Sequence, residues 1–380
     1  MRVFYFQLLR RCKPHFVAIH FQETGGGKEY HKKMAIVEPF IRDLHRLIKQ
    51  QIGEFDGIGI IDDQFDVDES FTALGAVYLV DHSIRHDAQI WNTEVGKFER
   101  LRSGFRVIKF TEPEPFVKRH KFPQHFFPEY QWSRKGFIWT KWRLKTWEFR
   151  LVNIHLFHDA CNIQASKKSP SIYSDRRKTA LNYVLEKLSS LNDSNNLAQF
   201  LFGDFNFRLD TKTIVEDLTS GAQMDDAQNG KTIRYRRPPD NENVLTLATK
   251  KFEHVNHGNL LNQFTKLLPH DCELLSFPSL RECEITFPPT YPYSENVESP
   301  SLLMRTRCPA WCDRILMNEQ AWNFVNACSN KEYHSLGQTT CTGDHKPVYL
   351  SLECGDSQLC ERNGDILVMP PEPKTCIVQI

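Results

Sequence analysis

The chain has 380 residues, and its 48 basic and 47 acidic side chains leave a formal net charge of only +1. This length can bury a core without metal or disulfide cross-links, and it fits one large domain or two ordinary ones. The charge balance argues against a protein that mainly neutralises a nucleic-acid backbone. No apolar stretch approaches the ~20 residues of a membrane span, and the N-terminal apolar patch precedes its basic residues, unlike a secretory signal. Scattered cysteines, eleven in number, favour a reducing compartment, so we expect a cytoplasmic protein.

Strands and helices alternate along the chain. Apolar runs predict strands at 16–21, 73–80, 137–144, 149–156, 199–202, 313–317 and 348–352. Helical spacing of apolar residues predicts helices at 34–52 and 174–188, the second capped by Ser174. The strands at 137–144 and 149–156 are separated by a short polar turn, which predicts a hairpin. Mostly antiparallel ribbons with interspersed helices indicate a layered α/β domain.

Three segments are expected to be irregular. Residues 225–242, rich in Asp, Asn, Arg and Pro, are predicted to form a surface excursion within the domain, and residues 288–300 form a second irregular stretch. From residue 355 the chain mixes Gly, Asn, Pro and charge. We therefore expect one domain over residues 1–354 and a flexible tail over 355–380.

The segment 201–210 carries the most functional information. Its apolar run stops at Gly203 and presents Asp204 and Asn206, whose side chains share one face of an extended backbone. A carboxylate that can accept a proton, beside an amide that can hold an anionic oxygen, suits hydrolysis of a phosphate ester by activated water. Gly, Asp and Asn are also ordinary turn residues, so a simple strand-to-turn exit is the alternative.

Four other strand ends carry polar groups. Glu23 could bind a hard cation such as Mg²⁺, or reach solvent. His155 could donate to a phosphoryl oxygen, or be structural. A third segment pairs two arginines with a Pro-Ala-Trp corner and could grip phosphate or form a surface charge cluster; these arginines are Arg305 and Arg307. In the fourth, His345 is suited to polarising a phosphoryl group if a carboxylate orients it, and the two candidates are Asp313 and Asp344.

These motifs together resemble a known family. Their order is Gln-Glu (22–23), Ser-Arg-Lys-Gly (133–136), His-Leu-Phe-His-Asp-Ala (155–160), Phe-Gly-Asp-Phe-Asn-Phe-Arg (202–208), Cys-Pro-Ala-Trp-Cys-Asp-Arg-Ile-Leu (308–316) and Gly-Asp-His-Lys-Pro-Val (343–348). The series, which spans residues 5–354, resembles the inositol polyphosphate 5-phosphatases. The chain is most similar to the type I enzymes, which act on soluble inositol 1,4,5-trisphosphate, through Phe-Pro-Pro-Thr-Tyr-Pro-Tyr-Ser (287–294).

The resemblance implies a fold and roles for the site residues. The fold is that of the endonuclease/exonuclease/phosphatase superfamily (DNase I-like), with two packed, mostly antiparallel β-sheets flanked by helices. Asp204 would position and deprotonate water, Asn206 and His155 would hold oxygens of the 5-phosphate, and His345, oriented by Asp313, would stabilise the transition state. Glu23 would hold Mg²⁺, and Asp344 would support its water shell. The substrate's phosphates would meet Lys135, Tyr291, Arg305, Arg307 and Lys346.

The implied activity is magnesium-dependent removal of the 5-phosphate from inositol 1,4,5-trisphosphate, and from the 1,3,4,5-tetrakisphosphate, which would end a calcium signal. Many lipid-acting relatives carry Lys where this chain has Pro292, so the soluble headgroup is the expected substrate. A monomer is expected. A nuclease of the same superfamily is the other possibility, but the net charge near zero argues against it. The basic residues Arg305, Arg307 and Lys346 suit a small polyanion better, so nucleic acid is not expected as a partner.

Two features depart from the family pattern. The family begins with a strand that supplies an Asn beside the metal, and no candidate lies upstream of Glu23, so we expect an open sheet edge. A catalytically impaired protein that binds inositol phosphates is the alternative this raises. The second departure concerns the prenylation signal, which Cys376-Ile-Val-Gln would form but for Ile380. Peripheral association with the inner face of the plasma membrane is expected only if Cys376 is lipidated.

Overall fold

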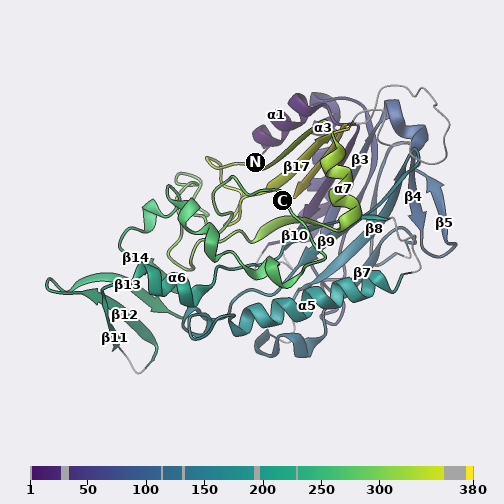
Figure 1. Ribbon diagram of the computed structural model, residues 1–380. Coiled ribbons are helices and arrows are strands. Elements are labelled where there is room, and N and C mark those ends of the chain that lie inside the picture. Colours follow the sequence, from purple (N-terminus) through teal and green to yellow (C-terminus); the bar gives the residue numbers. More distant parts are fainter. Residues whose placement is uncertain are drawn as a thin grey trace.

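Two large sheets pack face to face in this computed structural model, with helices on their outer faces (Figure 1). The structure describes residues 2–26, 34–112, 114–130, 133–191, 197–227, 230–354 and 374–379. The expected fold class, packed sheets flanked by helices, is confirmed.

The first sheet contains β1, which ends next to Glu23. In spatial order its strands are β16 (Asn330–Ser335), β17 (Val348–Glu353), β18 (Lys374–Gln379), β1 (Phe16–Phe21), β3 (Gly75–Asp81), β2 (Phe55–Ile61) and β6 (Phe105–Lys109). Side chains of β1 alternate between two cores, as a strand buried on both faces requires. Phe16 and Ala18 face the second sheet, whereas Val17 and Ile19 pack with the outer helix α3 (Val37–Gln51).

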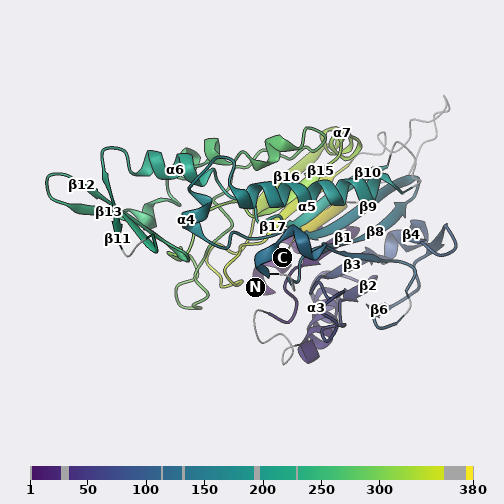
Figure 2. The same cartoon turned by 90° about the horizontal axis from the view of Figure 1, so that it is seen from below.

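The second sheet carries most of the site residues. Its order is β15 (Asp313–Met317), β10 (Ala198–Asp204), β9 (Trp147–His155), β8 (Gly136–Leu144), β4 (Ala88–Asn92) and β5 (Lys97–Arg100), and β7 (Lys118–Lys121) also pairs with β8. Helix α5 (Ile172–Ser189) covers its outer face, where Leu181 and Val184 share a core with Ile154. Figure 2 shows α5 and α3 on opposite sides of the paired sheets.

Most of the predicted elements are confirmed within a few residues. The strand 16–21 is β1, the predicted hairpin is β8 and β9, and the strand 313–317 is β15. The cap of α5 differs, because the Ser171 side chain, not that of Ser174, accepts from the helix, at 3.1 Å from the Ser174 amide nitrogen. The remaining helices are α1 (Arg2–Cys12), α4 (Asn162–Ala165), α6 (Thr211–Leu218) and α7 (Glu319–Ala327).

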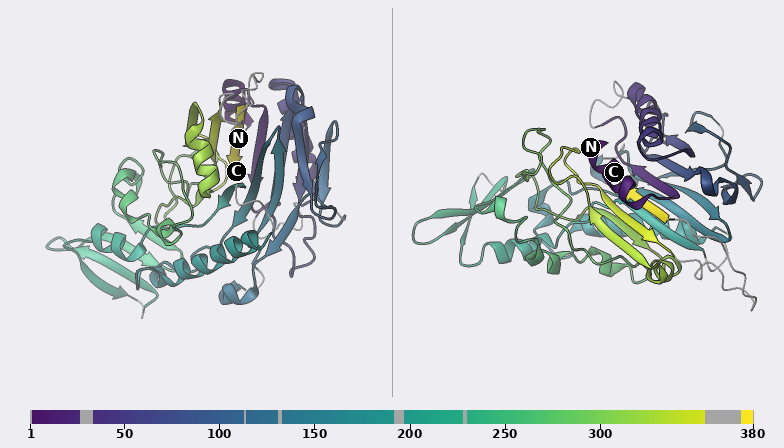
Figure 3. Two further views of the ribbon diagram at one scale, coloured as in Figure 1. Left: turned by 45° about the vertical axis from the view of Figure 1, so that its right-hand side comes forward. Right: turned by 90° about the horizontal axis from the view of Figure 1, so that it is seen from above.

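The expected surface excursion at 225–242 lies on the surface, but it is built of strands and forms part of a third sheet. Its strands are β11 (Gln223–Ala227), β12 (Thr232–Arg237), β13 (Glu242–Ala248) and β14 (Lys251–His254). The sheet projects from one end of the molecule (Figure 3). Its base is anchored, because Leu245, Leu247 and Phe252 are buried in the main core. The sequence pattern of β11 and β12 is typical of a loop, because these short strands are polar and bury few residues. Only β13 and β14 have an apolar pattern.

The open edge expected beside β1 is occupied in the structure. Strand β18 lies between β1 and β17, parallel to the first and antiparallel to the second. Its register runs from Phe16 opposite Thr375 to His20 opposite Gln379. Residues 374–379 therefore differ from the flexible tail expected for 355–380, and the rest of that tail lies outside the described residues.

Among the described cysteines, Cys328 and Cys354 form a disulfide that joins the end of α7 to the end of β17. Disulfides are uncommon in the reducing compartment that the scattered cysteines favour. No helix within the described ranges combines the length and apolarity needed to cross a bilayer.

Candidate active site

Pairing between three adjacent strands assembles the centre of the site. β9 and β10 are parallel with His155 opposite Asp204, while β10 and β15 are antiparallel with Asp204 opposite Asp313. Directly opposed residues on neighbouring strands share one face of the sheet. Gly203 permits the close approach of β10 to β9, because a Cβ at this position would lie 1.9 Å from the Ile154 carbonyl oxygen. The register thus brings together residues that are far apart in the sequence.

Asp204 is held as an ionised carboxylate. Its Oδ2 lies 3.1 Å from His155 Nε2, and its Oδ1 accepts from the Asn206 backbone N–H at 2.7 Å. Burial disfavours its charge, but His345, His155 and Lys135 outweigh burial and hold the pKa of Asp204 well below its usual range. An ionised, nearly buried carboxylate with fixed geometry is suited to orient water and accept its proton.

Asn206 supports Asp204 and also lines the cavity. It has a left-handed backbone, with φ of 51°, and its Nδ2 donates to Asp204 Oδ2 at 2.8 Å and to the Leu156 carbonyl at 3.0 Å. Its Oδ1 accepts from Arg208 at 2.6 Å. The side-chain amide is therefore hydrogen-bonded within the protein, and its contact with a phosphate oxygen stays a prediction. A strained conformation at this position is consistent with a functional constraint.

His345 and Asp313 form a pair beside Asp204. His345 Nδ1 lies 2.8 Å from Asp313 Oδ2. Burial opposes the charge on the imidazole, but the carboxylates of Asp313, Asp204 and Asp344 prevail and raise the pKa of His345 well above its usual value. A charged imidazole in this position can stabilise negative charge that develops on a phosphoryl group.

Glu23 reaches the same centre from the first sheet. Its carboxylate lies 3.6 Å from Lys135 Nζ and 3.9 Å from His155 Nε2. Burial favours its neutral form, but Lys135, His155 and Arg134 lower the pKa of Glu23 to about 2. Asn153 ties this strand end to the second sheet, because it donates to the Phe21 carbonyl at 3.1 Å. Glu23 also has a left-handed backbone, with φ of 53°.

The donor set fits a hard divalent cation. Glu23 and Asp344 both line the cavity together with Asp204, and carboxylate oxygens are the donors that Mg²⁺ prefers. Ligand atoms of Asp204, Asp313 and His345 also lie within 4.8 Å of one another. The second group is less suited to a cation, since His345 is charged and paired with Asp313. Glu23 is the better candidate ligand, and Asp344 lines the same cavity.

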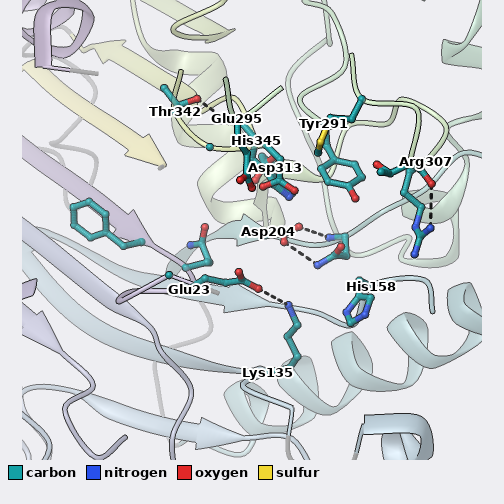
Figure 4. Close-up of a pocket in the computed structure, with 18 of the residues that line it drawn as sticks. Glu23, Lys135, His158, Asp204, Tyr291, Glu295, Arg307, Asp313, Thr342 and His345 are labelled. Atoms are coloured by element: carbon teal, nitrogen blue, oxygen red, sulfur yellow. Dashed lines mark hydrogen bonds and ion pairs between the residues drawn. The ribbon is translucent and has the colours of Figure 1, made fainter. Parts of the chain in front are cut away.

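These residues form one end of a cavity of about 680 Å³, and the other end is cationic. In Figure 4, Tyr291 and Arg307 lie to the upper right of Asp204, and His158 lies below them, to the right of Lys135. Arg307 donates to the carbonyls of Thr249 at 2.9 Å and Asp159 at 3.0 Å. The cavity thus has a carboxylate end around Asp204 and a cationic end around Arg307. A substrate with several phosphates would need both, one end for the phosphate that reacts and the other for the phosphates that do not.

Arg208 and His158 line the cavity but were not among the predicted site residues. Arg208 is 5 % exposed and lies 4.3 Å from the Tyr291 ring, and its Nε and one terminal nitrogen have no partner among the described residues. A buried guanidinium with free donors is ready to bind an anion. His158 lines the same end, and burial together with Lys135 lowers its pKa to about 3. Arg208 could have been found from its alternation with Asp204 and Asn206.

Two predicted phosphate-binding residues lie elsewhere. The Arg305 guanidinium, 60 % exposed, pairs with Glu253 on β14 and does not line the cavity. The Lys346 ammonium donates to the carbonyls of Pro300 at 2.9 Å and Thr340 at 2.7 Å, which makes Lys346 a loop anchor. A cation near a motif can point either way, so contact of these two residues with the substrate stays a prediction, although neither lines the cavity. Lys135, Tyr291 and Arg307 do line the cavity.

Comparisons with known proteins identify relatives over most of the chain. The profile of the Endonuclease/Exonuclease/phosphatase family 2 matches residues 9–351. Inositol polyphosphate-5-phosphatase A of Rattus norvegicus is 41% identical over 365 residues, which covers 92% of this chain and 87% of the relative. A probable type I inositol 1,4,5-trisphosphate 5-phosphatase of Caenorhabditis elegans is 36% identical, covering 89% of this chain and 90% of that protein.

The solved inositol polyphosphate 5-phosphatase domain of a synaptojanin, in complex with inositol (1,4)-bisphosphate and calcium ion, superposes with a TM-score of 0.47 at 14% identity, covering 96% of this chain and 76% of that one. The sequence relatives decide the assignment, because they are alike over nearly the whole length of both chains. The chain therefore belongs to the inositol polyphosphate 5-phosphatase family.

Proposed function

We propose that this protein is a magnesium-dependent phosphomonoesterase that removes the 5-phosphate from inositol 1,4,5-trisphosphate and from the 1,3,4,5-tetrakisphosphate, and so ends a calcium signal. One observation carries the proposal: the strand register sets Asp204 between His155 and the Asp313–His345 pair, on the wall of a cavity with a cationic far end. The names of the similar proteins from rat and nematode support the substrate class.

Asp204 acts as the general base in this proposal. Its carboxylate stays ionised and accepts the proton of the attacking water, while Asn206 fixes its orientation through two hydrogen bonds. Lys135 and His155, which contact each other, hold phosphoryl oxygens, and the Lys135 ammonium neutralises their charge. Positioning and charge neutralisation account for most of the catalysis of phosphoryl transfer.

His345 acts beside the base, since ligand atoms of His345 and Asp204 lie within 4.8 Å of each other. Its charge, maintained by Asp313 at 2.8 Å, stabilises the negative charge that develops as the ester bond breaks. Mg²⁺ bound at Glu23, with Asp344 in the same cavity, would supply further charge neutralisation on the phosphoryl oxygens. Tyr291, Arg307 and Arg208 hold the rest of the substrate.

The test is phosphate release by the purified chain. With Mg²⁺, we expect inositol 1,4,5-trisphosphate to give inositol 1,4-bisphosphate, identified by ³¹P NMR, and we expect no release from inositol 1,4-bisphosphate itself. EDTA should abolish turnover and added Mg²⁺ should restore it. Loss of a phosphate from another ring position would refute the proposal. Binding by calorimetry without turnover would favour the impaired inositol-phosphate-binding protein instead.

We propose further that the protein is a cytoplasmic monomer acting on soluble headgroups. Cys376 is paired in β18 with Val17 on one side and Ser351 on the other, so lipidation would compete with this strand. Light scattering after size exclusion should report one chain per particle. Detergent partitioning of protein made in eukaryotic cells should leave it in the aqueous phase, and a lipid on Cys376 would contradict this.

A further inference from the structure

We infer that Lys250 is a substrate-binding residue that holds a phosphate other than the one removed. This inference rests on the proposed function. Lys250 lies in the turn between β13 and β14, within the third sheet, and it lines the same cavity as Asp204 and Arg307. No sequence motif marked it, because the turn belongs to a segment that is remote from every predicted site residue in the chain.

The turn that carries Lys250 is fixed to the cationic end of the cavity. Arg307 donates to the Thr249 carbonyl at 2.9 Å. Asn162 donates from one amide nitrogen to the carbonyls of Lys251 and Thr306, each at 2.9 Å. The Phe252 N–H also donates to the Arg305 carbonyl at 2.9 Å. Because these bonds hold both sides of the turn, Lys250 is positioned relative to Arg307 and does not move with the projecting end of the sheet.

Neighbouring cations on this surface are already paired, whereas Lys250 is not. Lys251 Nζ lies 2.8 Å from Glu253, and Glu253 also pairs with Arg305. Among the described residues, Lys250 has no hydrogen bond or ion pair, and it is the one of these three that faces the cavity. Glu253 therefore holds two cations away from the site and leaves the third for a ligand.

Among the described residues, the adjoining part of the cavity has more cations than carboxylates, because Asp159, which lies near Arg208 and Arg307, is already paired with Arg177 at 2.6 Å. Arg208 is buried with two nitrogens that have no partner among the described residues, and Arg307 uses its donors on backbone carbonyls. Neither guanidinium donates to a carboxylate through these bonds. The carboxylates of Asp313, Asp204 and Asp344 lie around His345, at the other end of the cavity. A ligand with a second phosphate would supply the missing negative charge. Lys250, exposed at the turn, would meet the outer side of that phosphate.

The test compares Lys250→Ala with Lys251→Ala, which removes the same charge one residue away. For inositol 1,4,5-trisphosphate, we expect Lys250→Ala to raise KM about tenfold with kcat within about twofold, a typical size for loss of one charge-assisted contact. Lys250→Arg should restore most of the affinity. Lys251→Ala should resemble the parent chain. For inositol carrying only the 5-phosphate, Lys250→Ala should have no effect.

Equal KM values for the two alanine variants would overturn the inference while leaving the proposed function intact. An equal loss with the mono- and the trisphosphate would also overturn it, because Lys250 would then act on the cleaved phosphate or on folding. Calorimetry with inositol 1,4,5-trisphosphate on an Asp204→Asn background should show the same tenfold weakening. A parent chain that neither binds nor hydrolyses the trisphosphate would overturn both the inference and the proposed function.

Discussion

The two ends of the cavity each contain a histidine, and the two imidazoles have opposite charge states. At the carboxylate end, Asp313, Asp204 and Asp344 overcome burial and keep His345 charged. At the cationic end, burial acts together with Lys135, Arg208 and Arg307 to lower the pKa of His158 to about 3, which keeps it neutral. Identical imidazoles thus acquire opposite charge states from their neighbours. One end is organised to handle a proton and developing charge, and the other to hold negative charge that is already present.

Removal of the general base Asp204 should have the largest effect on activity, and it should affect only the carboxylate end. Asp204→Asn deletes the proton acceptor but keeps the shape of the side chain, so kcat should fall about 10³-fold while inositol 1,4,5-trisphosphate still binds. Steady-state phosphate release and calorimetry measure the two quantities. Asp210→Asn, at the cap of α6 and outside the cavity, is the matched control and should stay within about twofold. Substantial turnover by Asp204→Asn would rule out Asp204 as the base.

The cationic end should depend on a buried network beneath it. Arg177 is fully buried and contacts Asp159 at 2.6 Å and Glu273 at 2.6 Å, and the Asp159 carbonyl in turn accepts from Arg307. Arg177→Met would leave two buried carboxylates unpaired, which should lower the free energy of unfolding by about 3–5 kcal/mol. Urea denaturation measures this change. Arg176→Met, which removes the partner of the more exposed Glu129, should cost less than about 1 kcal/mol.

Arg208 tests whether the cationic end binds substrate. Arg208→Met removes the buried guanidinium with two free nitrogens, so KM for inositol 1,4,5-trisphosphate should rise about 10- to 100-fold. A smaller fall in kcat is expected, since Arg208 also contacts Asn206. Arg234→Met on β12, outside the cavity, serves as control. A change confined to kcat would place Arg208 with the carboxylate end instead.

The smallest expected signal comes from His158. With a folded-state pKa of about 3 against an ordinary value of 6.5, its imidazole takes up a proton only well below pH 5. Folding therefore favours the deprotonated form, and this group's contribution to stability is present above pH 6.5 and declines as the pH falls toward 3. In NMR titrations from pH 8 to 5, its ring signals, assigned with His158→Gln, should stay flat. A midpoint near pH 6.5 would contradict the contrast between the two ends.

Local patterns predicted the parts of the site that depend on neighbours in sequence. Asp204 follows an apolar strand, Glu23 closes another, and Asp313 opens a third, because the strand period of two determines which side chains share a face. The same patterns could not separate Arg307, which lines the cavity, from Arg305, which pairs with Glu253. The two arginines are only two residues apart, and local spacing does not distinguish them. The direction of the Arg305 side chain depends on its partner Glu253 on β14.

The amino-acid sequence by itself thus determined the strands, the motifs and the chemistry that Asp204 and His345 can perform, since these follow from residue type and local spacing. Only the tertiary structure decided that β18 lies between β1 and β17, that Lys346 anchors a loop, and that Lys250 reaches the cavity. Each of these outcomes depends on hydrogen bonds between segments far apart in the chain. No local pattern encodes such pairings, because many distant partners would satisfy the same donors and acceptors.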